Sequence, residues 1–360
     1  MMKTTTASPA ARILVVTLTA LMAGCGGGGS EPSSSSGQSL TSPGTTPTTP
    51  TTPTSPTAPT TPTTPTTPTT PSGGMAAINT SSRAEVAAFY NTTMLPAFSV
   101  PMQWTGSTQG CVAGTTSAEY KAAVLNTVNS FRVLAGLPGN VSLNLTHSAM
   151  AQQAALMMDA NSQLSHSPPT SWSCYTADGA TAAGRSNLAL GNAGPNAVRA
   201  YIADSGTSSL GHRRWVLYSR LGEVGTGDTT RANSLWVFDG TVTAPATVAE
   251  TGVAWPARGY VPWTTKVADP SHPWSFSLPG ADFSGASVTM SNDQGKVLSV
   301  SNVGQLPSGY GDNTMSWKLD APASEWSRSP ADTKFNVQIS NVKVGGQAKS
   351  FQYSVTFFVP

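Results

Sequence analysis

The sequence predicts an α+β protein with a mostly helical part followed by an all-β part. Three observations carry this prediction. Apolar residues recur at helical spacing between residues 116 and 204. Alternating apolar and polar residues, separated by Gly and Asn turns, take over after about residue 245. Residues 75–360 also provide enough chain for two domains, with expected bounds of 75–244 and 245–360.

The first 24 residues are typical of an export signal. Lys3 and Arg12 accompany an apolar run, Ile13–Leu21, which is too short for a membrane-spanning helix. The segment Leu21–Cys25 resembles a bacterial lipobox, whose Cys takes a lipid and becomes the mature N-terminus. Lipidation of Cys25 would anchor the protein to a membrane without spanning it.

The residue after this Cys indicates a destination. Gly26, rather than Asp, is similar to lipoproteins that are sent onward to the outer membrane. We therefore expect an exported protein that is lipid-anchored to the cell envelope, at the outer membrane. The alternative is an ordinary secretory signal with an incidental Cys25, because small residues precede the cleavage site in both signal types.

The net charge of the mature chain gives no reason to expect a nucleic-acid partner. The whole sequence has 19 Lys and Arg against 17 Asp and Glu, and removing Lys3 and Arg12 with the signal leaves 17 against 17. Nucleic-acid binding needs a basic face that attracts phosphates. For a formally neutral protein we expect no nucleic-acid partner.

Residues 25–74 are predicted to form a stalk. They contain almost no apolar residues and settle into Thr-Thr-Pro repeats between Thr45 and Pro71. Such a segment cannot bury enough surface to offset the entropy of ordering, and its Pro residues favour extended polyproline II. The stalk would hold the folded part away from the membrane. A disordered spacer of unimportant length is the alternative, and it differs only in degree.

Periodicity and capping signals predict four helices in the first part. Ser82–Glu85 and Thr116–Glu119 are capping boxes, in which a Ser or Thr side chain satisfies the first free N–H groups of a helix. Pro96 and Gly136 are stop signals. The expected helices begin near Ser82, Thr116, Thr146 and Asn196, and they end before Pro96, at Gly136, at Gln163 and at Asp204.

Strands are expected at the end of the first part and throughout the second. Two strand-like runs follow the last helix, joined by a polar turn at residues 228–231. In the second part, several short alternating strands predict an Ig-like β-sandwich. The expected strands are Gly222–Thr226, Ser234–Phe238, Trp274–Leu278, a hairpin over Ser287–Val300, and Phe335–Ile339 paired with Phe351–Phe357.

Two features of the sequence have competing interpretations. The aromatic-rich segment Tyr260–Trp263 would either bind sugars by stacking or seal a contact between domains. Once Cys25 is lipidated, Cys111 and Cys174 are the remaining thiols, and an oxidising compartment favours a disulfide between them. Two separate buried thiols are the alternative.

Four short motifs follow one another along the chain: Leu164-Ser165-His166, Asn187-Leu188-Ala189, Gly211-His212-Arg213-Arg214-Trp215 and the strand-like Leu221–Gly227. Their order resembles the CAP superfamily of SCP-like, cysteine-rich secretory domains. The resemblance covers residues 115–240, about a third of the chain, and implies an α-β-α sandwich ahead of the β-sandwich. In such domains two His and two acids converge in a groove, which holds a divalent metal in some members.

The resemblance assigns four groove residues. His166 and His212 match the two His, Asp204 matches the second acid with a shorter side chain, and Ser186 stands where the first acid is expected. The groove would then offer His166, His212 and Asp204 to a divalent metal such as zinc, with weak or absent binding because one carboxylate is lost. Without the resemblance, two His so far apart are unrelated structural residues.

Other enzyme signatures are missing from the sequence. It contains no Gly-x-Ser-x-Gly, no His-Glu-x-x-His and no phosphate-binding glycine loop. The strand start at Glu223 favours a structural role for this acid. We therefore expect a binding or interaction module at the cell envelope, with an envelope protein, a lipid or a glycan as its ligand. The alternative is a degenerate metal-dependent or His-based hydrolase, since imidazole titrates near neutral pH.

Overall fold

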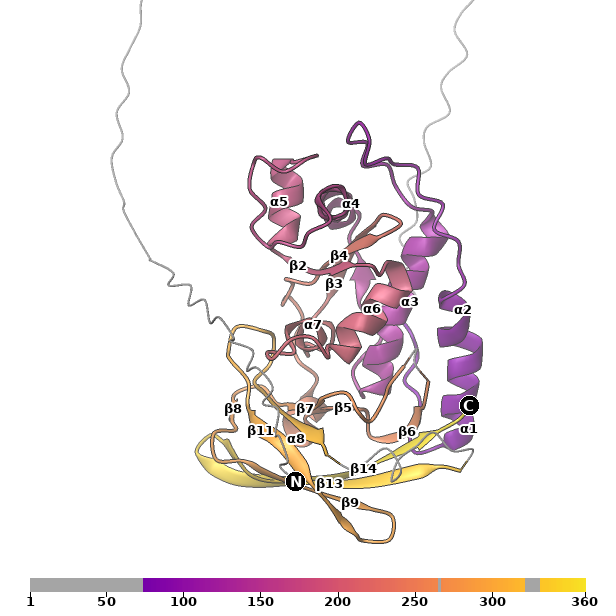
Figure 1. The fold of residues 1–360 in the computed structure, drawn as a ribbon. Coiled ribbons are helices and arrows are strands. Elements are labelled where there is room, and N and C mark those ends of the chain that lie inside the picture. Colours follow the sequence, from indigo (N-terminus) through magenta and orange to yellow (C-terminus); the bar gives the residue numbers. More distant parts are fainter. Residues whose placement is uncertain (1–73, 265–266, 321–330) are drawn as a thin grey trace, which may run out of the picture. The chain divides into compact units, whose positions relative to one another are not determined.

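The computed structural model describes residues 74–264, 267–320 and 331–360 (Figure 1). The predicted signal and almost all of the predicted stalk lie outside these residues. The chain divides into two units, and all described residues belong to the second, Thr66–Pro360. Within the described ranges, no helix combines the length and the apolar character needed to cross a bilayer.

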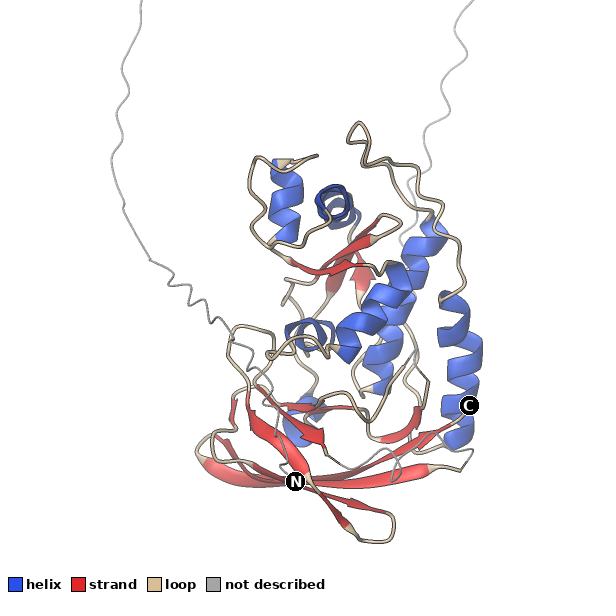
Figure 2. Ribbon diagram, viewed as in Figure 1, coloured by secondary structure: helices blue, strands red, loops and turns tan. Residues whose placement is uncertain are grey.

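Helices in the first part flank a four-stranded sheet (Figure 2). Its strand order is β1-β3-β4-β2, with antiparallel β3/β4 and β2/β4 pairs. The sheet is parallel at one edge, where β1 runs parallel to β3 and pairs Ser142 with Glu223. The long connection from β1 through several helices to β3 permits a parallel pair. The strands are β1 (Ser142–Leu143), β2 (Ser186–Leu190), β3 (Glu223–Asp228) and β4 (Ala232–Trp236).

Two helical layers enclose this sheet. One layer contains α4 (Leu145–Asn161) and α5 (Ala177–Ala183), and the other contains α3 (Ala118–Leu134) and α6 (Gly194–Ala203) (Figure 1). Ala and Met side chains of α4 and α5 pack on Leu188 and Trp236 in a small core of their own. The Met residues of α4 are therefore core residues, where flexible thioethers fill irregular space.

Capping explains where the predicted helices begin. The first helix, α1 (Arg83–Phe89), starts at Ser82 as predicted, and a π-helical turn, η1 (Tyr90–Met94), and α2 (Leu95–Ala97) continue it past Pro96. Pro96 is tolerated because it lies in the first turn of α2, where a missing N–H costs little. Helix α3 begins one residue later than predicted, since the Ser117 side chain, not Thr116, accepts from Tyr120 N–H.

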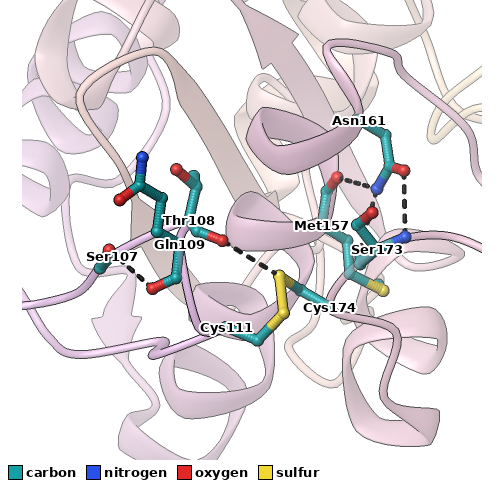
Figure 3. The surroundings of a disulfide bond; sticks show 8 residues. All are labelled: Ser107, Thr108, Gln109, Cys111, Met157, Asn161, Ser173 and Cys174. Atoms are coloured by element: carbon teal, nitrogen blue, oxygen red, sulfur yellow. Dashed lines mark hydrogen bonds between the residues drawn. A yellow bond between two sulfur atoms is a disulfide. The ribbon is translucent and has the colours of Figure 1, made fainter.

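Two short helices of the first part were not predicted from the sequence. Both α5 and α7 (Gly211–Val216) are too brief to show a hydrophobic period. Helix α5 follows a loop that a disulfide ties down. Figure 3 shows Cys111 and Cys174 joined by this bond, which confirms the predicted pairing. Next to it, Asn161 at the end of α4 hydrogen-bonds Ser173 N and O, which fixes the loop on the helix.

Two facing sheets form the C-terminal part, after a short helix α8 (Ala246–Thr251). Trp274 and Phe276 of one sheet contact Phe335, Phe351 and Phe357 of the other, so aromatic rings fill the space between the sheets. One sheet is ordered β11-β12-β7-β5 and the other β10-β9-β13-β14-β6, with β8 on β13. Their bounds are β5 (Val253–Trp255), β6 (Gly259–Pro262), β7 (Trp274–Ser277), β8 (Ala281–Asp282), β9 (Ser287–Asn292), β10 (Val297–Leu298), β11 (Val300–Gln305), β12 (Thr314–Leu319), β13 (Thr333–Val344) and β14 (Gln347–Phe358).

The predicted pairing of the last two strands is confirmed, with Phe335 opposite Val355 and Ile339 opposite Phe351. The predicted hairpin over Ser287–Val300 is correct only for β9 and β10, because β11 leaves this sheet and pairs with β12 in the other one. Strand β6, which holds most of the aromatic-rich segment, pairs with β14, and Tyr260 N–H donates to Thr80 O ahead of α1. These contacts favour a packing role for the segment.

Candidate functional site

Three of the four predicted groove residues, His166, Ser186 and His212, line one cavity of about 580 Å³. This volume falls within the range of small-molecule sites, roughly 300–1,000 Å³. The first part of the chain supplies most of the lining, and one loop of the β part supplies the rest. The lining residues are His166, Gly184, Ser186, Asn187, Thr207, Ser209, Gly211, His212, Trp215 and Phe238 from the first part, and Ser308, Gly309 and Tyr310 from the second.

His212 is held from behind by Asp204. Its Nδ1 lies 2.9 Å from Asp204 Oδ1, and the Asp204 side chain is 1 % exposed. Asp204 is the residue at which α6 ends, in a left-handed conformation with φ 42°. Its carboxylate also accepts from Arg213 N–H and Thr207 Oγ1. Asp204 therefore orients the imidazole and does not itself line the cavity.

Electrostatics keep Asp204 ionised. Burial alone would raise its pKa, but the hydrogen bond from His212 and the charge of Arg213 outweigh burial, and the pKa of Asp204 lies below its usual value. An ionised carboxylate can only accept, so Nδ1 of His212 carries a proton, and Nε2 has no partner in the described hydrogen bonds.

His166 is oriented in a similar way from another element. Its Nδ1 lies 2.8 Å from Ala183 O at the end of α5. A carbonyl oxygen is also an acceptor only, so Nδ1 of His166 is again the protonated nitrogen. Both imidazoles that line the cavity therefore have Nδ1 in a hydrogen bond with the protein, whereas Nε2 has no partner in the described hydrogen bonds.

Ser186 is the first residue of β2 and lies on the same cavity. It is 3 % exposed, and its Oγ has no hydrogen-bond partner among the described residues. The hydroxyl is thus not paired with either imidazole, which removes the Ser–His pair that a serine hydrolase needs. A buried hydroxyl without a partner costs free energy unless a ligand or water satisfies it.

Residues 125–239 match the model of the Cysteine-rich secretory protein family, CAP. This segment is a CAP domain. The match contains both histidines, Ser186 and Asp204 but ends well before Tyr310. None of the curated proteins compared with the chain matches it.

The CAP domain contributes an aromatic surface that sequence reasoning missed. Trp215 of α7 lies with its ring centroid 4.4 Å from that of Phe238, which is 45 % exposed. The third ring, Tyr310, belongs to the β part and is 37 % exposed. Trp215 follows the Gly-His motif directly, but nothing in the sequence indicates that residues near 238 and 310 meet it.

Tyr310 packs closely on the CAP domain. A Cβ added at Gly211 would lie 2.8 Å from Tyr310 Cδ1, so the glycine of the Gly-His pair leaves room for this ring. The guanidinium of Arg214 lies 5.4 Å from the centre of the same ring. The wall from the β part is therefore in direct contact with the helix that carries His212.

Neighbouring arginines on α7 fasten the CAP domain to the β part. Arg213 is 1 % exposed and donates to Pro273 O, while Arg214 donates to Pro307 O and Asp312 O on either side of Tyr310. Burial lowers the pKa of each arginine to about 10, so both stay charged at neutral pH. These contacts fix α7 and the 307–312 loop relative to each other.

The residues of the cavity do not fit a metal ion. Asp204 was predicted as a third ligand beside His166 and His212, but its carboxylate is occupied behind His212. Across residues 74–264, 267–320 and 331–360, no group of three or more His, Cys, Asp or Glu side chains could hold a metal. Catalytic zinc sites use three protein ligands, and Ser186 supplies no carboxylate.

The remaining candidates lie elsewhere. His147 stacks on Trp236 with ring centroids 4.1 Å apart and does not line the cavity. His272 lines a different cavity next to Asp269. Glu223 accepts from Asn144 Nδ2 at the start of α4, in keeping with the structural role expected for it.

Proposed function

We propose that this protein is a lipid-anchored binding module of the cell envelope, and that its CAP domain takes a ligand in the cavity between His166, His212 and Tyr310. The observation that carries the proposal is the set of unused polar groups in this cavity. Two imidazole Nε2 atoms and the Ser186 hydroxyl face no protein partner in the described hydrogen bonds. Convergent unsatisfied polar groups in a preformed cavity are typical of ligand sites.

The anchoring part of the proposal rests on the sequence. The lipobox-like segment ending at Cys25 would attach the chain to a membrane, at the outer membrane according to Gly26. The Thr/Pro-rich residues 26–74 would then separate the CAP domain from the lipid surface. A binding site carried on a stalk can reach a ligand that is fixed elsewhere in the envelope.

Site-specific photo-cross-linking in the host cell tests the binding role for a ligand of any chemical class. A benzophenone amino acid replaces Ser308, an exposed residue on the cavity, in the full chain. The matched control carries the same group at Ser284, an exposed residue of the β part outside the cavity. We expect a defined adduct from position 308 that Trp215→Leu diminishes. Equal adducts from both positions, or none from position 308, would contradict the proposal.

One observation favours a second candidate, a His-based hydrolase. His212 with Asp204 behind it has the geometry of a general base whose orientation a buried carboxylate fixes. Such a base would have to activate water, since Ser186 Oγ is not bonded to either imidazole. Hydrolysis of envelope peptides or esters that is lost in His212→Gln and kept in His147→Gln would favour this candidate over the binding module.

A further inference from the structure

We propose that the cavity binds a neutral sugar unit of a glycan, and that Tyr310 of the β part forms part of the binding surface. This inference rests on the proposed function, because it names the ligand class for the same cavity. It follows from what the lining contains, what it lacks and how rigidly its rings are held.

The apolar surface of the cavity is aromatic. Trp215, Phe238 and Tyr310 supply it, and the described lining contains no Leu, Ile, Val or Met. An acyl chain gains affinity by burying methylene groups against a continuous apolar lining. The lining here is interrupted by hydroxyls and imidazoles, which a hydrocarbon would desolvate without pairing. A pyranose ring suits such a surface, because its C–H face packs on aromatic rings while its hydroxyls reach polar groups at the edge.

A charged ligand would find no Lys, Arg, Asp or Glu side chain of opposite charge among the described lining residues. The Asp204 carboxylate lies behind His212 with its side chain 1 % exposed. A uronic acid, a phosphate headgroup or a charged peptide would lose its hydration without gaining an ion pair. A neutral ligand avoids this cost.

The polar groups match sugar hydroxyls in kind. In the neutral ring, Nε2 of each cavity histidine is an acceptor. Ser209 and Ser308 carry hydroxyls that both donate and accept, and Thr207 Oγ1 can accept because its proton goes to Asp204. The buried Ser186 Oγ has no protein partner. A sugar hydroxyl donates and accepts at the same time, so one ligand could satisfy both kinds of group.

A peptide is the competing polar ligand, and the backbone argues against it. Peptides in grooves commonly add a strand to an exposed sheet edge. The edge strand at this cavity is β2, whose residues Ser186–Ala189 are buried and therefore not open to strand addition.

Tyr310 is held in place before any ligand arrives. Gly309 and Gly311 flank it with φ of 94° and 58°, a left-handed backbone that other residues rarely adopt. Asp312 accepts from Ser219 N–H and Ser219 Oγ on the CAP domain. A preformed aromatic surface loses less conformational entropy on binding than a mobile one.

Titration calorimetry with the full chain in detergent micelles tests the proposal. The probes are neutral oligosaccharides of glucose, mannose, galactose and N-acetylglucosamine, with hexagalacturonate as the acidic comparison and phosphatidylglycerol vesicles as the lipid comparison. We expect at least one neutral oligosaccharide to bind. Tyr310→Leu should weaken it about fivefold or more. The matched control is Tyr175→Leu, a partly exposed tyrosine outside the cavity, which should leave the affinity unchanged.

Each failure has a distinct meaning. If circular dichroism shows a folded protein and no neutral oligosaccharide binds, the sugar proposal is overturned. Binding of only hexagalacturonate or only vesicles would overturn it as well, and an adduct from position 308 would then leave the binding role standing. Equal weakening by Tyr310→Leu and Tyr175→Leu would show that the sugar binds elsewhere, which also overturns the proposal.

Discussion

Asp204 at the end of α6 and His212 in the first turn of α7 are joined by a hydrogen bond of 2.9 Å that commits one ring nitrogen of the histidine. The family resemblance places an acid at position 204 but does not specify which side of the imidazole it occupies. The structure places Asp204 on the side away from the cavity, so its role is to orient His212.

Asp204→Ala should destabilise the protein by about 3 kcal/mol, because it leaves Arg213 N–H and His212 Nδ1 without an acceptor in a buried place. The folded-state pKa of Asp204 is depressed, so its contribution is present at neutral pH and is lost as pH falls below the usual aspartate pKa. Urea denaturation at pH 7 and pH 3 measures both effects. Asp293→Ala, at an exposed turn, serves as the control and should change little. A loss of equal size at both pH values would contradict the pH assignment.

Asp228 should have the opposite pH dependence. It is fully buried, and burial raises its pKa to about 6 despite hydrogen bonds from Asn233, Gly194 N and Thr226. The folded state therefore binds a proton more tightly than the unfolded chain. Stability should fall by about 3 kcal/mol through this group as pH rises from about 4 to 6. Asp228→Asn should flatten this part of the stability profile measured by thermal or urea unfolding. An unchanged slope between pH 4 and 6 would show that another group titrates there.

Restoring a carboxylate at position 186 should create a zinc site. Ser186 lines the cavity with both histidines. A carboxylate at this position adds a third ligand, and its negative charge compensates the charge of the ion. We expect weak or absent zinc binding by the natural protein and at least about tenfold tighter binding by Ser186→Glu, measured by calorimetric titration. Ser209→Glu, on the same cavity, tests whether the position matters. If the natural protein binds zinc tightly and His166→Ala/His212→Ala binds it equally well, these histidines are not the site.

Removing the disulfide should cost about 4 kcal/mol on the chain-entropy model, since Cys111 and Cys174 are separated by 63 positions. Cys111→Ser/Cys174→Ser should therefore unfold at lower urea concentration than the oxidised natural protein. The natural protein treated with reductant provides the control, and it should show the same loss. Equal midpoints for the oxidised protein and the double variant would contradict a stabilising role.

Membrane attachment should depend on one sulfur atom. Cys25→Ser should abolish incorporation of a labelled fatty acid in the host cell, because only the Cys sulfur takes the diacylglycerol. Cys111→Ser/Cys174→Ser should keep the label. Label retained by Cys25→Ser would overturn the lipobox interpretation in favour of an ordinary secretory signal.

Local signals in the sequence predicted the long elements. The apolar period of α3 and α4 and the alternation of β13 and β14 are each repeated over many residues, so tertiary contacts reinforce them. The short helices α5 and α7 have no such repetition, and the direction of β1 depends on a partner 81 positions away, Glu223.

The sequence predicted which residues belong to the site but not how they are arranged. The motif order named His166, Ser186, Asp204 and His212, and three of these four line one cavity. Nδ1 of His166 is hydrogen-bonded to Ala183 O, and Nδ1 of His212 is hydrogen-bonded to Asp204 at the left-handed end of α6. The spacing of these residues in the sequence reveals neither contact. Tyr310 lies 98 positions after His212 and reaches the cavity only through the packing of the two parts.

Because Tyr310 packs against Gly211, the cavity extends beyond the segment that matches the CAP family. A gene segment that is exchanged at residue 239, the end of the family match, would transfer both histidines but not Tyr310. Recombination at that border yields a domain whose cavity is open on one side. Residues 125–239 alone therefore lack Ser308, Gly309 and Tyr310, the part of the cavity lining that the β part supplies.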